Sequence, residues 1–258
     1  MRCDFRPTII ELLLDEQDRN RAQLWLPEFV MRGETDHNSA AIISPVQWQS
    51  EGRSWRYKHF VEQEQITIAA SVEATDDGFL MSMSVANHSD QSWPNVAGIV
   101  CLLLGTAPDF ANPDRTRSWF RAGGKLQTFA GSQMVGGQPP FRMSLVRGME
   151  QVERTKRHRN KWGFTQQESD DGVIAVTSPD EKQILALTWQ QVHHLQLNAC
   201  GAYCCIHANP AFGNMAPGEQ RTVHGAILLS RGSLESAWEK VLGMCENPPH
   251  CGSGPNSL

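Results

Sequence analysis

One hairpin constrains the fold of this chain more than any other feature of its sequence. Apolar and polar residues alternate along 66–72 and again along 79–85, which is the period of a strand that buries one face. Asp77-Gly78 stands between the two segments, and this dipeptide is typical of tight hairpin turns. The sequence therefore predicts an antiparallel sheet that is covered on one side.

Further segments along the chain have the same character. Residues 172–177 and 184–189 predict a second hairpin, which turns at Ser178-Pro179-Asp180. The near-continuous apolar run 97–104 is typical of a central strand that is covered on both faces. Strands are also predicted over 192–199 and 222–229.

Only one helix is predicted, close to the C-terminus. Ser233 is a good N-cap residue, and Leu234, Trp238 and Val241 follow at helical spacing, with Gly243 as the expected stop. Many short strands, long Gly/Pro-rich loops and one late helix predict an all-β protein. We expect a single-domain β-sandwich over 1–244 and a flexible C-terminal tail over 245–258.

Composition and charge exclude several classes of function. The chain has 258 residues, of which 40% are hydrophobic, and a net charge of −5, whereas generic nucleic-acid binding requires a basic surface. No apolar run approaches the roughly 18 residues of a membrane span. The N-terminus lacks the apolar core of a signal peptide, so we expect a cytoplasmic protein. Whether it forms a homo-oligomer is left open.

The seven cysteines are scattered and form no CxxC pair. The strongest sequence signal for structural zinc is therefore absent. Reduced thiols in a reducing compartment are the expected state. Cys101 lies inside a predicted strand and is interpreted as a small buried apolar residue. Cys245 and Cys251 flank a Pro-rich segment and are the one pair that could form a disulfide.

The segment from Cys205 to Gly225 reads CIHANP, then PGE, then TVxG. This block resembles the C-terminal part of galactose-mutarotase-like and other carbohydrate-active sandwich proteins of bacteria. The resemblance covers about a fifth of the chain and implies a mutarotase-like supersandwich with a carbohydrate as ligand. It transfers no catalytic residue, and Asn209 stands where such relatives favour an acidic residue. The Pro217-Gly218 turn is expected to precede an outer strand.

The expected function is therefore acid–base chemistry on a sugar or uronate, as in a lyase, epimerase or hydrolase. His194 or His207 would act as acid or base, because imidazole titrates near neutral pH. Tryptophan faces stack on sugar rings, while arginine and asparagine bind carboxylates and hydroxyls. The candidate substrate-binding residues are Arg117, Trp119, Arg121, Trp189 and Asn198.

Several alternatives remain beside this hypothesis. The chain could be a non-catalytic carbohydrate-binding or assembly module. It could hold a metal through His194, Cys205 or His207, although no cofactor is otherwise expected. Cys205 and His207 would share a strand face, which would also suit a thiol nucleophile. The basic run 154–164 could bind an acidic polysaccharide, but such runs are more often solvated surfaces.

Overall fold

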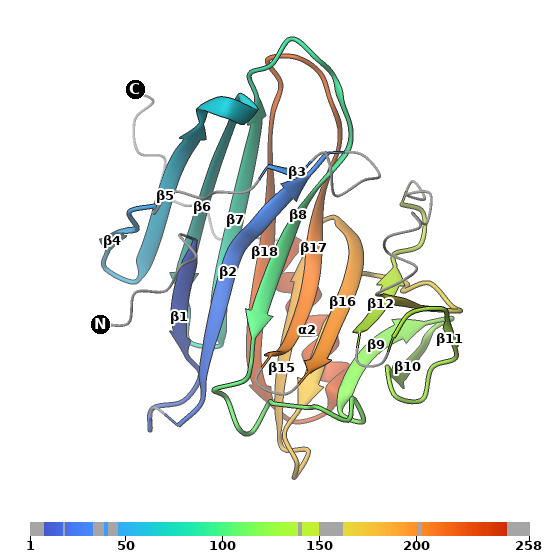
Figure 1. Cartoon of the computed structure of the whole chain (residues 1–258). Coiled ribbons are helices and arrows are strands. Elements are labelled where there is room, and N and C mark those ends of the chain that lie inside the picture. Colours follow the sequence, from blue (N-terminus) through green and yellow to red (C-terminus); the bar gives the residue numbers. More distant parts are fainter. Residues whose placement is uncertain are drawn as a thin grey trace.

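The computed structural model describes residues 8–17, 19–32, 39–40, 46–138, 141–149, 162–200 and 203–246. Within these ranges the chain forms two large sheets and a C-terminal helix (Figure 1). The prediction of an all-β sandwich with one C-terminal helix is confirmed. No helix among the described residues has the length and apolar character needed to cross a membrane.

Sheet A has the strand order β1-β2-β8-β17-β16-β12-β13-β11, with β3 paired to β2. Its pairs are antiparallel except for β12 with β13. The strands of sheet A are β1 (Ile9–Leu13), β2 (Arg21–Met31), β3 (Ser39–Ala40), β8 (Trp93–Leu103), β11 (Met134–Val135), β12 (Phe141–Leu145), β13 (Gly163–Thr165), β16 (Val192–Cys200) and β17 (Tyr203–Met215).

Sheet B has the strand order β10-β9-β14-β15-β18-β7-β6-β5-β4. A single 3-10 turn, Glu62–Glu64, joins β5 to β6. The strands of sheet B are β4 (Gln49–Glu51), β5 (Ser54–Val61), β6 (Ile66–Ala74), β7 (Gly78–Asn87), β9 (Ser118–Ala122), β10 (Lys125–Thr128), β14 (Ile174–Thr177), β15 (Gln183–Trp189) and β18 (Gln220–Arg231).

Both predicted hairpins are present. Strands β6 and β7 pair around Asp77-Gly78, and β14 pairs with β15. The expectation that Pro217-Gly218 precedes an outer strand is wrong, because β18 lies in the interior of sheet B between β15 and β7. Its apolar run Ala226–Leu229 is covered on both faces, since Ile227 packs in the core between the two sheets, while Ala226 and Leu228 pack on the opposite face against the C-terminal helix.

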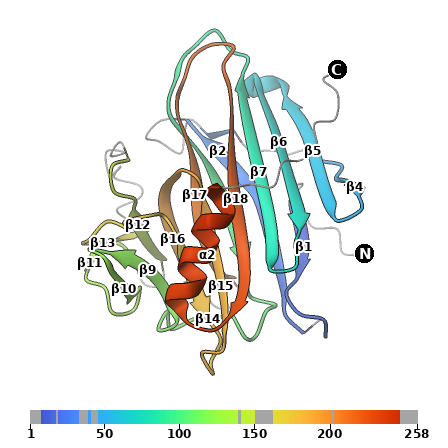
Figure 2. The same ribbon diagram turned by 180° about the vertical axis from the view of Figure 1, so that it is seen from behind.

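The main core lies between the two sheets and includes Ile68, Met83, Leu102, Leu187 and Ile206. A smaller core forms on the outer face of sheet B, where α2 (Leu234–Glu246) packs across β15 and β18 (Figure 2). The outer faces of the two sheets therefore differ, because the helix seals part of sheet B.

Helix α2 begins as predicted and ends later. Ser233 Oγ accepts the backbone N–H of Ser236 at 3.1 Å, which is N-capping. The predicted stop at Gly243 is wrong, because the helix continues through it to Glu246. Val241 and Cys245 are buried against sheet B, and this packing outweighs the low helix propensity of glycine. Cys251, the suggested partner of Cys245, lies outside the described residues.

Candidate functional site

A group of polar side chains lies on the outer face of sheet A, on the neighbouring strands β16 and β17. The cross-strand register places His194 opposite Asn209, and Gln196 opposite His207. The residues that alternate with them, such as Leu195, belong to the core between the sheets. Because successive side chains of a strand point to opposite faces, the polar set points away from that core.

These polar side chains are nonetheless shielded from solvent. His194 is 2% exposed, His207 is 4% exposed and Asn209 is fully buried. Buried polar groups need hydrogen-bond partners, and hydrogen bonds are stronger where water is excluded. The site is thus a low-dielectric cluster rather than a wet surface patch.

Asn209 connects three parts of this cluster. Its Oδ1 accepts the backbone N–H of Val100 on β8 at 3.0 Å. Its Nδ2 lies 3.0 Å from Gln196 Oε1 and 2.8 Å from His194 Nε2. The side chain therefore joins the three central strands of sheet A and fixes the ring of His194.

His193 and His194 contact each other, although neighbours on a regular strand would point to opposite faces. Their Nδ1 atoms are 2.7 Å apart, and the rings meet edge to face with centroids 4.9 Å apart. The pairing of β16 with β17 shifts register between Val192 and His194, which is a bulge-like irregularity. This irregularity turns the two imidazole rings toward each other.

A second group contains Cys205 and His207 of β17 with Cys101 of β8. Cys205 Sγ lies 3.2 Å from His207 Nε2. A hydrogen bond with the Cys101 thiol, aided by the charge of His207, lowers the pKa of Cys205 well below its ordinary value against the effect of burial. Burial alone would lower the pKa of His207, but the negatively charged Cys205 raises it on balance. Proximity favours a thiolate–imidazolium pair.

Arg117 and Arg121, two of the predicted substrate-binding residues, have structural partners. The guanidinium of Arg117 donates to the backbone carbonyls of Asp109, Ala111 and Thr177. Arg121 pairs with Asp171 and Glu239 and lies 5.3 Å from the ring of Trp238. Arg117 therefore connects the loop at 109–111 with β14, and Arg121 connects β9 with Asp171 and with α2.

Trp119 and Trp189 lie far from sheet A's outer face. Trp119 packs with the core under α2, and its Nε1 donates to Thr177 Oγ1 at 3.4 Å. Trp189 is 2% exposed and belongs to the main core, so it presents no ring face for a sugar to stack on. Asn198 lies on the same face as His194, opposite Cys205, and its Oδ1 accepts the N–H of Cys200.

The structure thus brings together His194, His207 and Asn198 from the predicted set, and separates Arg117, Trp119, Arg121 and Trp189 from them. The sequence reasoning did not include Gln196, Asn209 or Cys101 in the site. The parity of Gln196 with His194, and of Asn209 with His207, is a signal that could have found two of them. Residues 154–161 of the basic run, which include all of its charged side chains, lie outside the described residues.

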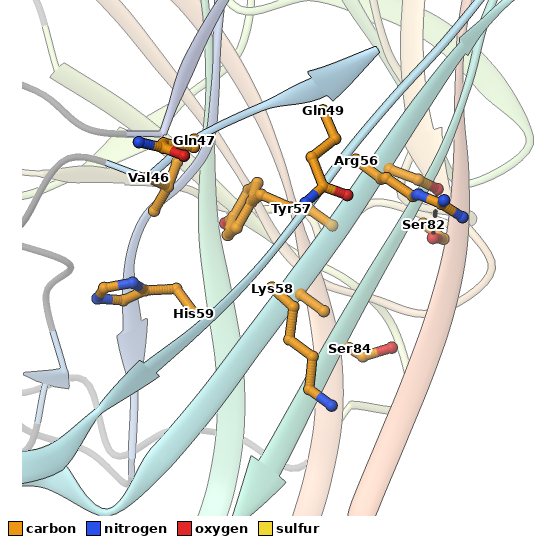
Figure 3. A pocket seen from close by; sticks show the side chains of 12 residues that line it. Val46, Gln47, Gln49, Arg56, Tyr57, Lys58, His59, Ser82 and Ser84 are labelled. Atoms are coloured by element: carbon orange, nitrogen blue, oxygen red, sulfur yellow. Dashed lines mark hydrogen bonds between the residues drawn. The ribbon is translucent and has the colours of Figure 1, made fainter. Parts of the chain in front are cut away.

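A separate hollow of about 660 Å³ lies at the edge of sheet B, over β4 to β7 (Figure 3). Exposed Arg56 and Lys58 and the hydroxyls of Ser71, Ser82 and Ser84 line it. The hydroxyls of Ser71 and Ser82 bond to each other at 2.7 Å. None of the residues predicted from the sequence lines this hollow.

No family model matches the chain, and no curated protein matches it. Among solved structures, the Slr1438 protein of Synechocystis sp. PCC 6803 is 10% identical, with TM-score 0.49, over 90% of this chain and 100% of that one. A putative aldose 1-epimerase of Escherichia coli K12 is 12% identical, with TM-score 0.46, over 82% and 84%. A galactose mutarotase-like protein of Lactobacillus casei ATCC 334 is 11% identical, with TM-score 0.43, over 81% and 85%. Overlays this distant carry no argument about function, and the fold class stands on the strand pairing itself.

Proposed function

We propose that this chain is a carbohydrate-active protein and that its ligand site is the shielded polar cluster around His194 on the outer side of sheet A. The observation that carries this proposal is the convergence of imidazole and amide groups from two adjacent strands, β16 and β17, at one place. Sugar hydroxyls both donate and accept hydrogen bonds, and amide and imidazole groups match them in both senses.

The acid–base role is assigned to His194. Val100 N–H fixes the amide of Asn209 so that Nδ2 faces His194 Nε2. Nε2 then accepts a hydrogen bond, and the ring proton sits on Nδ1, shared with His193. A neutral imidazole in this state can take a proton from a sugar hydroxyl or from a carbon next to a carboxylate. The proton would bind Nε2 after the hydrogen bond from Asn209 Nδ2 is broken.

The other members of the face have supporting roles. Gln196 and Asn198 carry amides on the same side of β16, where they can bind hydroxyls. His207 is engaged by Cys205 through Nε2, so its role is separate from that of His194. The resemblance of the 205–225 block to carbohydrate-active sandwich proteins supports the same ligand class.

The test is a binding screen of the full chain against neutral and uronate-containing mono- and oligosaccharides, followed by NMR of any ligand found. His194→Gln is the diagnostic variant. His224→Gln is its matched control, because His224 lies on sheet B beside Ser82. We expect a sugar whose affinity falls at least about tenfold in the first variant and is unchanged in the second. Equal affinity in both variants, or no sugar bound, would overturn the proposal.

The same experiment separates an enzyme from a binding module. NMR of the bound sugar over time follows any change at the anomeric or ring carbons. Conversion that depends on His194 supports acid–base catalysis. Binding that depends on His194 without conversion supports the non-catalytic carbohydrate-binding module.

A further inference from the structure

Three side chains with metal-binding atoms meet in the middle of sheet A. The thiols of Cys101 and Cys205 and the imidazole of His207 each offer one ligand atom, and all three atoms lie within 4.8 Å of one another. All three residues are buried. Among the described residues, this is the group of histidine, cysteine or acidic side chains whose ligand atoms lie close enough together to hold a metal ion.

Strand pairing places these residues together without help from loops. Strands β8 and β17 pair with Cys205 opposite Leu103, Ile206 opposite Leu102 and Ala211 opposite Ala97. This register puts Cys101 beside His207, with Cys205 two residues along the same face. Both strands are interior in sheet A, so the backbone that carries the ligand atoms is held on both sides.

The spacing suits a metal ion. Zinc–sulfur and zinc–nitrogen bonds of about 2.3 and 2.0–2.1 Å at tetrahedral angles set neighbouring ligand atoms about 3.5–3.8 Å apart. The Cys205 Sγ to His207 Nε2 distance of 3.2 Å is slightly shorter, and the whole group spans at most 4.8 Å. Small side-chain rotations therefore suffice to enclose an ion.

We propose that Cys101, Cys205 and His207 form a binding site for one thiophilic transition-metal ion, zinc(II) or copper(I). Two thiolates and an imidazole are soft to borderline ligands that favour these two ions over magnesium or calcium. Binding releases two protons, one from the Cys101 thiol and one held by the Cys205–His207 pair, as two metal–sulfur bonds and one metal–nitrogen bond form with no change of oxidation state. Three ligands satisfy trigonal copper(I) and leave one position open on tetrahedral zinc(II).

Two side chains from the neighbouring strands flank the site. Trp25 of β2 stands opposite Cys101 and packs with both cysteines. Gln196 of β16 stands opposite His207 on the other side. An ion here would have the indole of Trp25 on one flank and the amide of Gln196 on the other.

This set revises the metal hypothesis drawn from the sequence. His194 is held by Asn209 and His193 and stands apart from the ion site, while Cys101 takes its place. The metal site does not depend on the sugar proposal. A variant of His194 leaves all three ligands intact, so failure of one proposal can be told from failure of the other.

The test uses the full chain purified with a phosphine reductant and without chelator. Plasma mass spectrometry gives its zinc and copper content. Cobalt(II) titration of the metal-free protein then reports thiolate ligation through its sulfur-to-cobalt charge-transfer absorption. Competition with a chromogenic copper(I) chelator distinguishes the second ion. Cys101→Ser, Cys205→Ser and His207→Gln are the ligand variants.

Cys204→Ser is the matched control, because this buried thiol is adjacent in β17 but accepts the N–H of Asn112 and is outside the ligand set. We expect one equivalent bound by wild type and control, and at least about tenfold weaker binding in each ligand variant that keeps the wild-type circular dichroism. Absence of both the cobalt–thiolate band and copper(I) binding overturns the site. Unchanged metal affinity in Cys101→Ser or His207→Gln overturns it too.

Discussion

Asn209 Nδ2 lies 2.8 Å from His194 Nε2, while the Oδ1 of the same amide accepts the backbone N–H of Val100 at 3.0 Å. The backbone donor fixes which end of the amide faces the imidazole, because an N–H cannot bond to the NH₂ group. The tautomer of a histidine on one strand is thereby set by the backbone of a strand two positions away in the sheet.

The first prediction tests this relationship with Asn209→Asp. A carboxylate cannot donate to Nε2, so a protonated Nε2 would become the donor and His194 would carry a positive charge. Nitrogen NMR of labelled protein at neutral pH should show a neutral His194 in wild type and an imidazolium in the variant. A ring that is neutral and protonated on Nδ1 alone in both proteins would contradict the assigned orientation. Asn198→Asp, on the same strand face as His194, is the control and should leave the ring neutral.

The second prediction concerns Gly225, which lies against the ring of Trp189. A Cβ at Gly225 would lie 2.5 Å from the Trp189 ring and 2.8 Å from the Thr188 carbonyl oxygen. Gly225→Ala should therefore lower the free energy of unfolding by about 1–3 kcal/mol, measured by urea denaturation. Gly243→Ala is the control, since a Cβ there meets nothing within 4 Å and the residue is helical. It should stabilise the protein by up to about 1 kcal/mol.

The third prediction addresses Arg121 as a structural residue. Its guanidinium holds Asp171 and Glu239 and faces the ring of Trp238, so it attaches α2 to sheet B. Arg121→Met should cost about 1–2 kcal/mol of unfolding free energy. Arg53→Met removes only the exposed pair with Asp76 and should cost under about 1 kcal/mol. Equal costs for the two variants would show that Arg121 does not anchor the helix.

The fourth prediction uses Asp171. Burial raises the pKa of this carboxyl, although the hydrogen bond from Trp238 Nε1 and the charge of Arg121 lower it in part. A raised pKa means that the folded state favours the protonated form. The contribution of Asp171 to stability is then fully present below its ordinary pKa and is lost as pH rises through the folded value.

Asp171→Asn removes this titration but keeps an acceptor for Trp238. Urea unfolding of both proteins from about pH 3 to pH 7 should show wild type losing stability relative to the variant as pH rises through the acid range, then a constant difference. The slope is compared rather than the absolute value, because asparagine also removes a partner of Arg121. Parallel curves throughout would show that the pKa is not raised.

Local pattern was sufficient to predict much of the fold. The hairpins around Asp77-Gly78 and 178–180 and the start of the helix at Ser233 depend on neighbours in the sequence, and all are present. The extension of the helix past Gly243 could not be predicted, because it depends on burial of Cys245 against distant strands.

The site was harder to predict, for a related physical reason. His194 and His207 lie on consecutive strands, so hairpin pairing alone places them on one face. Cys101 meets Cys205 only because β8, from a remote part of the chain, pairs with β17. Trp189 and Arg121 have the right chemistry for a sugar, but their burial and ion pairs are consequences of three-dimensional packing.

The last prediction concerns thiol reactivity. Cys200 is exposed, whereas Cys245 lies on the buried face of α2, is 4% exposed, and burial raises its pKa to about 12. Only the thiolate reacts with iodoacetamide, so at about pH 8 Cys200 should be alkylated in the native protein and Cys245 only after denaturation. Peptide mass spectrometry at timed intervals reads each cysteine separately, and Cys204, also buried, is the internal comparison. Alkylation of Cys245 at the rate of Cys200 would show that the helix C-terminus is not packed as described.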